Sequence, residues 1–418
     1  MFEKLFNITA TITRHRNAPH VKEREQYLAY CAQEGYAKAT LRVIAGELLW
    51  AARKLSISSD PELKVNFEQI KAAAKGWKER ERCCGHVLNK LWTRDRFIRI
   101  TRKWFLFMGR LQEPLKESTP FLDLIENFIK WMEQERGLAP STIELWSDYV
   151  RQFLNWYEDK KRAICEIEIS DVDSFLAARG RKNWCRVTVA NCAVSLRAFF
   201  RYAAMRGCCR SSIAEAIQAP RIFSQENLPS GPSWEDVIRL LASMETEQPS
   251  DIRNRAIVML FAVYGLRESE VCKLRLEDID WEHEHILVPR VKRRQPQIYP
   301  LAPTVGNAIA KYLKEIRPKF CAQREVFLTL TPPFRPISRG GLYSLTSRRM
   351  IKLGLHSPHR GPHSLRHACA NHLLSEGFSL KEIGDHLGHR SSFATRIYAK
   401  VNLTGLREVA KFDIGGLL

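Results

Sequence analysis

The segment LGHRSSFATRIYAK, residues 387–400, places a glycine, a histidine, two arginines and a tyrosine close together in the chain. The pattern predicts a turn at Gly388 and then a short helix with Tyr398 near its end. Two interpretations are open at this point. Tyr398 is either a core aromatic surrounded by solvated charges, or a nucleophile whose basic neighbours bind a phosphate. The rest of the sequence has to distinguish them.

The composition favours a polyanionic partner. The 418 residues include 66 Lys and Arg against 46 Asp and Glu, a net charge of +20. Such an excess most often accompanies nucleic-acid binding, although a basic protein without that partner is the alternative. The sequence has no stretch of 18 apolar residues and no signal-peptide pattern at its start, so we expect a soluble, cytoplasmic protein without a membrane partner.

The cysteines and carboxylates do not suggest a metal centre. Eleven cysteines occur as singles and two adjacent pairs, and no CxxC motif is present. They are typical of reduced, mostly buried side chains in a cytosolic protein. ERCCGH, residues 81–86, is the one alternative that could ligate a metal. No acidic cluster indicates a Mg²⁺ site, so we expect neither a metal nor another cofactor.

Two stretches rich in proline, serine and charge, residues 112–120 and 219–233, are predicted linkers. They separate three segments: 1–111, 121–218 and 234–418. Residues 28–55 and 129–157 share a helix, a glycine and a second helix, with Gly35 and Thr40 offset by 102 from Gly137 and Thr142. We interpret them as two helical bundles related by duplication, the alternative being a generic likeness between helical units.

Several boundaries follow from local signals. In the second bundle, Ser141 or Thr142 is the expected N-cap of its second helix. In the third segment, residues 251–265 form a helix ended by Gly265, and HILVPRVKRRQPQIYPL, residues 285–301, is a β-hairpin. EVFLTL, residues 325–330, is expected to add another short strand. The fold class is therefore mainly α with a small antiparallel β-sheet, in an α+β third domain.

Phosphodiester cleavage without a metal requires a nucleophile and side-chain cations around the phosphate. PHSLRHACANHLLSEG, residues 362–377, predicts a helix capped by Ser364, with His363 and Arg366 projecting from its first turn. The helix N-terminus itself favours an anion. His367 and His372 are assigned to other faces of this helix, in packing or surface roles.

Two further motifs complete the set. YGLRESEV, residues 264–271, places Arg267 at a helix start after a glycine turn, with Glu270 one turn later. SLKEIGDHLGH, residues 379–389, begins with a capping box from Ser379 to Glu382 and ends at His389. In this order, R…HxxR…LGH…Y, the motifs closely resemble the tyrosine recombinase/integrase family over residues 121–405, about two-thirds of the chain.

The resemblance implies a role for each matched residue. It implies that Arg267 and Arg366 clamp the phosphate, that His363 transfers a proton with the nucleophile, and that His389 hydrogen-bonds the phosphate. Tyr398 matches the nucleophile, and Glu270 the acidic position that supports the first arginine. Lys292 matches the general acid in position, but its turn lacks the family's usual glycines, so a solvated contact with the DNA backbone is the alternative. The candidate DNA-binding residues are Arg293, Arg294, Arg390 and Arg396.

The resemblance also implies an architecture and a reaction. The architecture would be a helical, SAM-like core-binding domain followed by the catalytic domain. Residues 1–111 fall outside this two-domain pattern, and we interpret them as a second core-binding-like bundle. The reaction would cleave and rejoin double-stranded DNA at specific sites in the prokaryotic cytoplasm. We expect a tetramer on two DNA sites, with or without partner recombinases, that serves a mobile element. A type IB topoisomerase and a non-catalytic DNA-binding subunit are the alternatives.

Overall fold

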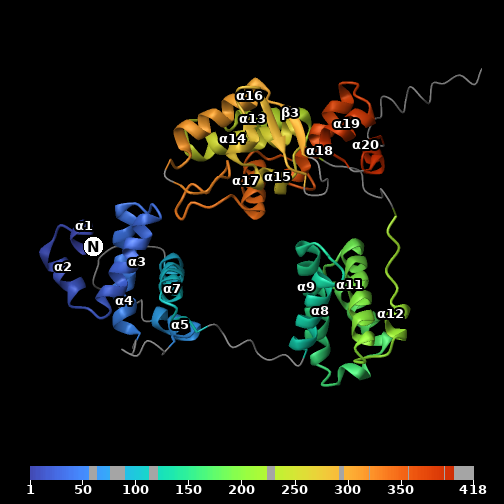
Figure 1. The fold of residues 1–418 in the computed structure, drawn as a ribbon, viewed down its shortest axis with the longest axis horizontal. Coiled ribbons are helices and arrows are strands. Elements are labelled where there is room, and N and C mark those ends of the chain that lie inside the picture. Colours follow the sequence, from blue (N-terminus) through green and yellow to red (C-terminus); the bar gives the residue numbers. More distant parts are fainter. Residues whose placement is uncertain are drawn as a thin grey trace, which may run out of the picture. The chain divides into compact units, whose positions relative to one another are not determined.

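The computed structural model describes residues 1–55, 64–75, 90–112, 121–223, 231–290, 296–319, 321–355, 357–389 and 391–399 (Figure 1). By its internal contacts the chain divides into two compact units, Gln112–Glu226 and a unit made of Met1–Leu111 with Asn227–Leu418. Within these ranges helices dominate and there is one small antiparallel sheet, so the predicted fold class is confirmed. Within the described ranges, no helix is both long and apolar enough to cross a membrane.

Residues 1–111 contain a helical core of their own, centred on buried side chains such as Leu48 and Trp104. The described helices here are α1 (Phe2–Leu5), α2 (Thr9–Arg16), α3 (Val21–Gln33), α4 (Lys38–Lys54), α5 (Phe67–Lys75) and α7 (Lys90–Phe107). Helix α4 packs against α3 and α7. The segment ERCCGH, considered above as a metal-ligand set, lies outside the described residues.

The unit Gln112–Glu226 is a second helical bundle, in which α8, α9 and α11 lie side by side (Figure 1). Its elements are α8 (Leu122–Gln134), α9 (Pro140–Glu158), the 3-10 turn η1 (Ile164–Glu166), α10 (Ile169–Lys182), α11 (Arg186–Met205) and α12 (Ser212–Ala216). Aromatic rings fill its core, among them Phe128, Phe153 and Phe200.

The two bundles share the local geometry expected of a repeat. Helices α4 and α9 begin at residues 38 and 140, an offset of 102, and the glycines before them, Gly35 and Gly137, both have positive φ angles (86° and 57°). A left-handed glycine after a helix lets the chain reverse into the next helix without side-chain strain. As α4 packs against α3 and α7, α9 packs against α8 and α11. The duplication stays a prediction.

Helix α9 begins two or three residues earlier than predicted. Its N-cap is Ala139, without a side-chain cap, and Pro140 occupies the first turn. Proline is favoured at this position because its φ angle is already helical and its missing N–H would have no partner there. The expected cap at Ser141 or Thr142 is therefore wrong, and Thr142 lies inside the helix.

The third part, residues 231–399, is built around α14 (Pro249–Tyr264), whose core includes Ile257, Leu260 and Phe261. The other helical elements are α13 (Trp234–Ala242), α15 (Glu268–Lys273), η2 (Leu276–Asp278), α16 (Pro303–Lys311), the π-turn η3 (Tyr312–Ile316), α17 (Arg339–Lys352), α18 (Pro362–Ser375), α19 (Leu380–Leu387), η4 (Ser392–Ala394) and α20 (Arg396–Ala399). Helix α14 packs against α13, α16 and α18. Gly265 ends α14 in a left-handed conformation, as predicted.

The sheet has three antiparallel strands in the order β1 (Ile279–Asp280), β2 (His285–Val288) and β3 (Gln297–Pro300). Ile286 pairs with Tyr299 and Val288 with Gln297, which confirms the hairpin. The prediction of a strand at residues 325–330 is wrong. Two isolated bridges hold that segment, Arg275 to Glu325 and Leu328 to Pro336, because its partners are short irregular stretches rather than a strand.

Candidate active site

The first arginine of the site is positioned by the turn between α14 and α15. Arg267 is the N-cap residue of α15, and its backbone N–H donates to Oε2 of Glu270 at 2.8 Å. Its guanidinium Nη1 donates to Oε1 of the same carboxylate at 2.9 Å. Glu270 is buried and thus fixes both the backbone and the side chain of Arg267. The predicted supporting role of Glu270 matches this geometry.

A second arginine, Arg290, shares the Glu270 carboxylate. Arg290 is 5% exposed and its Nη1 donates to Oε2 of Glu270 at 2.6 Å. Burial raises the pKa of Glu270, but hydrogen bonds from Arg267 and Arg290 outweigh that effect and hold it below its ordinary value. Glu270 therefore stays ionised at neutral pH and joins α15 to the end of the β2 strand.

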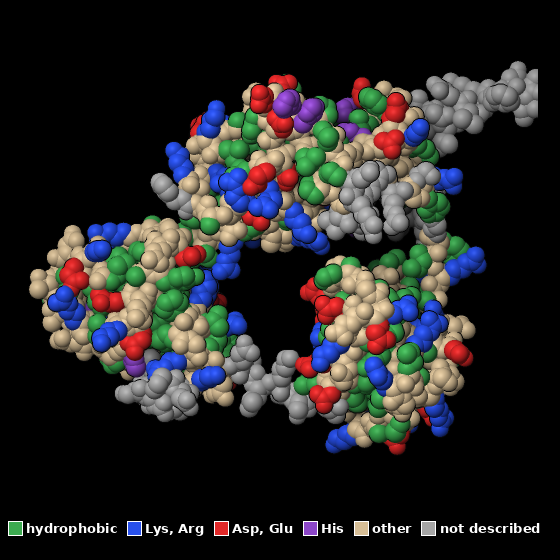
Figure 2. Space-filling model, viewed as in Figure 1, with side chains coloured by type: hydrophobic (Ala, Val, Ile, Leu, Met, Phe, Trp, Pro, Cys, Tyr) green, Lys and Arg blue, Asp and Glu red, His purple; other side chains and the backbone are tan. Residues whose placement is uncertain are grey.

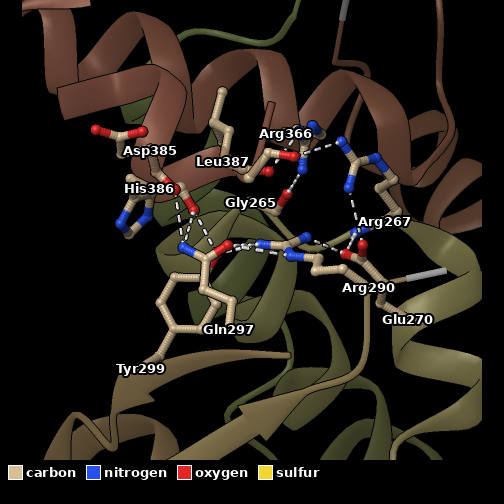
Figure 3. Close-up of polar contacts among 11 residues, drawn as sticks. Gly265, Arg267, Glu270, Arg290, Gln297, Tyr299, Arg366, Asp385, His386 and Leu387 are labelled. Atoms are coloured by element: carbon tan, nitrogen blue, oxygen red, sulfur yellow. Dashed lines mark hydrogen bonds and ion pairs between the residues drawn. The ribbon is translucent and has the colours of Figure 1, made fainter. Parts of the chain in front are cut away.

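Arg290 also ties the two arms of the hairpin together (Figure 3). Its Nε and Nη2 donate to Oε1 of Gln297 at 3.1 and 2.8 Å, and Nη2 also contacts the hydroxyl of Tyr299. Gln297 and Tyr299 lie on β3, while Arg290 directly precedes the segment that contains Lys292. The base of the predicted lysine hairpin is thus fixed by a buried polar network.

The C-terminal end of α19 is the meeting point of these groups (Figure 3). The last carbonyls of a helix lack helical partners and carry the negative end of the helix dipole, so cationic donors are favoured there. Four side chains donate to consecutive carbonyls: Gln297 to Asp385 at 2.8 Å, Tyr299 to His386, Arg366 to Leu387 at 2.8 Å, and Arg267 to Gly388 at 3.1 Å. Both predicted clamp arginines therefore converge on one helix end.

Arg366 occupies the centre of this arrangement. It is 2% exposed, and its second contact runs from Nη1 to the carbonyl of Gly265. Burial, reinforced by the charge of Arg267, lowers the pKa of Arg366 to about 10, which still leaves it protonated at neutral pH. A buried, protonated guanidinium beside Arg267 is a strong attractor for an anion.

Helix α18, which carries Arg366, begins at Pro362 rather than after Ser364. Gly361 is the N-cap residue, and Ser364 is a buried side chain that donates to the Gly361 carbonyl at 2.8 Å. As in α9, a proline sets the helix start ahead of the expected serine cap. His363 therefore lies in the first turn with its side chain exposed, and Arg366 follows one turn later on the buried side.

Gly388 ends α19 with a left-handed φ of 63° after the predicted Ser379–Glu382 capping box, which is present. His389 follows directly, and its Nδ1 lies 2.8 Å from Oγ1 of Thr395. Burial and the charge of Arg366 lower the pKa of His389 to about 4, so its imidazole is neutral at pH 7. Thr395 is buried and holds the segment after α19 against the helix.

Tyr398 is buried in a small apolar cluster with Ala370, Ile383 and Leu387. Its hydroxyl lies 2.9 Å from Nδ1 of His367. This contact corrects the sequence-based assignment of His367 to a packing or surface role. His372, by contrast, stacks on Trp234 with ring centroids 3.8 Å apart, which is a packing role.

The structure brings together most, but not all, of the predicted site. Arg267 and Arg366 donate to carbonyls at the end of α19, from which His389 follows. Glu270 bonds to Arg267, and Tyr398 lies on α20, which packs against α18. Arg396 is exposed at the start of α20, with its guanidinium 6.0 Å from the Phe393 ring. Four predicted residues lie outside the described residues: Lys292, Arg293, Arg294 and Arg390.

Four residues of this network are not predicted from the sequence: Arg290, Gln297, Tyr299 and Thr395. Arg290 and Gln297 flank the predicted hairpin turn, and a charged residue at the end of a strand is the one feature of the sequence that points to Arg290. This feature does not identify the residues that Arg290 and Gln297 contact, because Glu270 and α19 are distant from the turn in the sequence.

Comparisons with known proteins agree with the motifs. The phage integrase family model matches residues 234–404, and the phage integrase N-terminal SAM-like domain model matches residues 125–207. A Sinorhizobium fredii protein named as an integrase/recombinase, y4rA, is 36% identical over 68% of this chain and 69% of its own length. The tyrosine recombinase XerD of Listeria monocytogenes is 30% identical over 69% of this chain and 97% of its own length.

Solved structures share the fold. The XerH site-specific recombinase in a post-cleavage complex with palindromic difH DNA has a TM-score of 0.56 at 20% identity, covering 84% of this chain and 98% of its own. The Tn1549 transposon integrase in complex with transposon right-end DNA has a TM-score of 0.53 at 17% identity, covering 69% of this chain and 98% of its own. With the family models and the sequence relatives, this likeness shows that the chain belongs to the phage integrase family and is a tyrosine recombinase, an enzyme that breaks and rejoins DNA strands.

Proposed function

We propose that the chain is a site-specific recombinase of a mobile element, acting on double-stranded DNA in the prokaryotic cytoplasm through a 3′-phosphotyrosyl intermediate formed by Tyr398. The observation that carries the proposal is the convergence of Arg267 and Arg366 on the end of α19, with Tyr398 on a helix packed against α18. Two guanidiniums and a tyrosine within one small region suit a phosphodiester as substrate.

Each residue then has a chemical task. Arg267 and Arg366 hold the nonbridging oxygens and stabilise the charge that develops on them in the transition state. His389 hydrogen-bonds the same phosphate, and Lys292 protonates the departing 5′ oxygen. Because the phosphotyrosyl bond conserves the free energy of the phosphodiester, a second strand's 5′ hydroxyl can rejoin to it without ATP.

The basic surface supports duplex DNA as the partner. Residues 1–111 carry 22 Lys and Arg against 11 Asp and Glu, a net charge of +11 out of the chain's +20. Figure 2 shows Lys and Arg side chains on the visible face of this segment, of the second bundle and of the catalytic part. Basic side chains of this kind neutralise phosphates without reading sequence. We infer that both bundles contact DNA and that recombination uses a tetramer on two sites.

The test is covalent trapping on DNA that flanks the gene. A nicked suicide substrate, which loses a short strand after cleavage, should accumulate a protein–DNA adduct with the wild-type chain. Tyr398→Phe removes only the hydroxyl, so it should bind the same DNA and form no adduct. An adduct with Tyr398→Phe would overturn the assignment of the nucleophile.

Two rivals are separated by related assays. A type IB topoisomerase would relax supercoiled plasmid whether or not the flanking DNA is present, whereas a recombinase should exchange strands between two copies of its site. A non-catalytic DNA-binding subunit would retard the DNA without forming an adduct. The presence of Tyr398 on a helix packed against the Arg366 helix favours catalysis, because a binding module does not need a nucleophile.

A further inference from the structure

His367, rather than His363, holds the hydroxyl of the nucleophile. The Nδ1 atom of His367 lies 2.9 Å from the Tyr398 hydroxyl, and the two ring centroids are 5.7 Å apart. His363, one helical turn earlier, contacts the ring of His367 edge-on at 4.5 Å. The histidine that the family resemblance assigns to proton transfer is thus in contact with a second imidazole, and that second imidazole contacts the reacting oxygen.

The environment of both groups suits a proton transfer during attack. Burial raises the pKa of Tyr398 to about 12, so phenolate is negligible at pH 7 and the proton has to leave as the bond to phosphorus forms. Burial and the neighbouring His363 and Arg366 lower the pKa of His367 to about 4, so its imidazole is neutral and its Nδ1 lone pair can accept from the Tyr398 hydroxyl. A DNA phosphate bound by Arg366 would add negative charge nearby and raise the proton affinity of that imidazole.

We propose that His367 is the catalytic proton acceptor of Tyr398, an inference that rests on the proposed recombinase function. As the tyrosine oxygen bonds to phosphorus, its O–H bond breaks and the proton moves to Nδ1 of His367. The bond from phosphorus to the 5′ oxygen breaks, and that oxygen takes a proton from Lys292. In rejoining, each proton returns: the attacking 5′ hydroxyl gives its proton to Lys292, and His367 gives its proton to the departing tyrosine oxygen.

This role also requires a particular tautomer of His367 in the DNA-free protein. For His367 to accept, its proton must lie on Nε2, and the Tyr398 hydroxyl donates to Nδ1. Tyr398 is 2% exposed, and α20, which carries it, packs against α18 and α19. The nucleophile is thereby held next to its acceptor before DNA arrives.

The experiment uses His367→Asn in the full-length chain. The Asn amide oxygen accepts a hydrogen bond close to the former Nδ1 position but does not take up a proton at neutral pH. A general base contributes about 10²- to 10⁴-fold to rate, so single-turnover adduct formation on the suicide substrate should fall at least 100-fold, with unchanged DNA affinity. A loss smaller than tenfold would show that holding the hydroxyl is sufficient and would overturn the proposal.

Two further measurements separate proton transfer from folding and from the proposed function. Replacing Tyr398 by a fluorinated tyrosine, whose phenol is more acidic, should restore most of the rate in His367→Asn, because an acidic phenol does not need the base. Failure of this rescue in a chain that still binds DNA would refute the role of His367. His372→Asn, the same change on the same helix but at a residue stacked on Trp234, should leave the rate unaltered. If the wild-type chain itself forms no adduct, the proposed function fails instead.

Discussion

Gly388→Ala tests whether the end of α19 organises the site. Gly388 has a φ of 63°, a conformation that costs a non-glycine residue about 1–2 kcal/mol. A Cβ atom here would also lie 2.6 Å from Cζ of Arg290 and 2.7 Å from Oε1 of Gln297. The guanidinium is the mobile end of a long side chain, but it is 5% exposed and bonded to Glu270, Gln297 and Tyr299. It has no room to move without breaking that network.

The expected loss of stability follows from the interactions of Arg290 that Gly388→Ala would break. Displacing Arg290 removes one partner from the buried Glu270 carboxylate, and breaking such a pair costs about 3–5 kcal/mol. Gly354→Ala is the matched control, because Gly354 has nearly the same φ, 64°, with no atom within 4 Å of its Cβ position. The control should lose only the conformational strain, about 1–2 kcal/mol. Gly388→Ala should therefore be less stable than Gly354→Ala by roughly 3 kcal/mol or more.

The assay combines stability and chemistry. Urea unfolding of the full-length chain should show the larger loss for Gly388→Ala, and its adduct formation should fall, because the Gly388 carbonyl that accepts from Arg267 shifts. Gly354→Ala should form adducts at the wild-type rate. Equal stability losses in the two variants would refute the reasoning, because they would show that the Arg290 side chain can move away from Gly388 without loss of folding free energy.

Three other predictions concern the acid, the DNA footprint and Glu270. Lys292→Ala should cleave normal DNA poorly but recover on a substrate with sulfur at the bridging 5′ position, since a thiolate leaves without a proton; equal deficits would move the acid elsewhere. Deleting residues 1–111 should shorten the DNase footprint and reduce the salt dependence of binding, and an unchanged footprint would assign that segment to protein contacts. The folded-state pKa of Glu270 lies below 4.5, so its stabilising effect is present above that pH and lost in acid; the stability gap between wild type and Glu270→Gln should narrow below about pH 4.5, and a constant gap would exclude this role.

The sequence predicts the local features of the fold well. The Gly265 and Gly388 turns, the Ser379–Glu382 capping box and the hairpin all depend on residues close together in the chain. Both misplaced helix starts, at α9 and α18, have one cause: a proline one or two residues before a serine or threonine begins the helix itself. The strand predicted at residues 325–330 is absent for a different reason. A strand needs a neighbouring strand to pair with, and the composition of the segment does not identify one.

The residues of the candidate site also differ in whether short-range sequence features could predict them. Arg267 and Arg366 could be found because each belongs to a short motif whose residues are close together in the chain. Arg290 could not, because its significance depends on Glu270, twenty residues before it, and on Gln297, which in turn contacts the distant helix α19. His367 was misjudged for a related reason: helical spacing from Arg366 separates the two on the helix surface, but Tyr398 arrives from another helix and meets His367 there.

The carbonyls at the end of α19 explain why these distant residues belong to one site. A helix end offers several acceptors within a few ångströms, and here four different side chains use them. Arg267 and Arg366 each donate to one of these carbonyls with a single nitrogen, Nη2. A guanidinium has five N–H donors, so a carbonyl contact fixes the direction of the group while leaving other donors for a phosphate. The helix end thus orients both cations before DNA binds, which lowers the cost of reorganisation in the transition state.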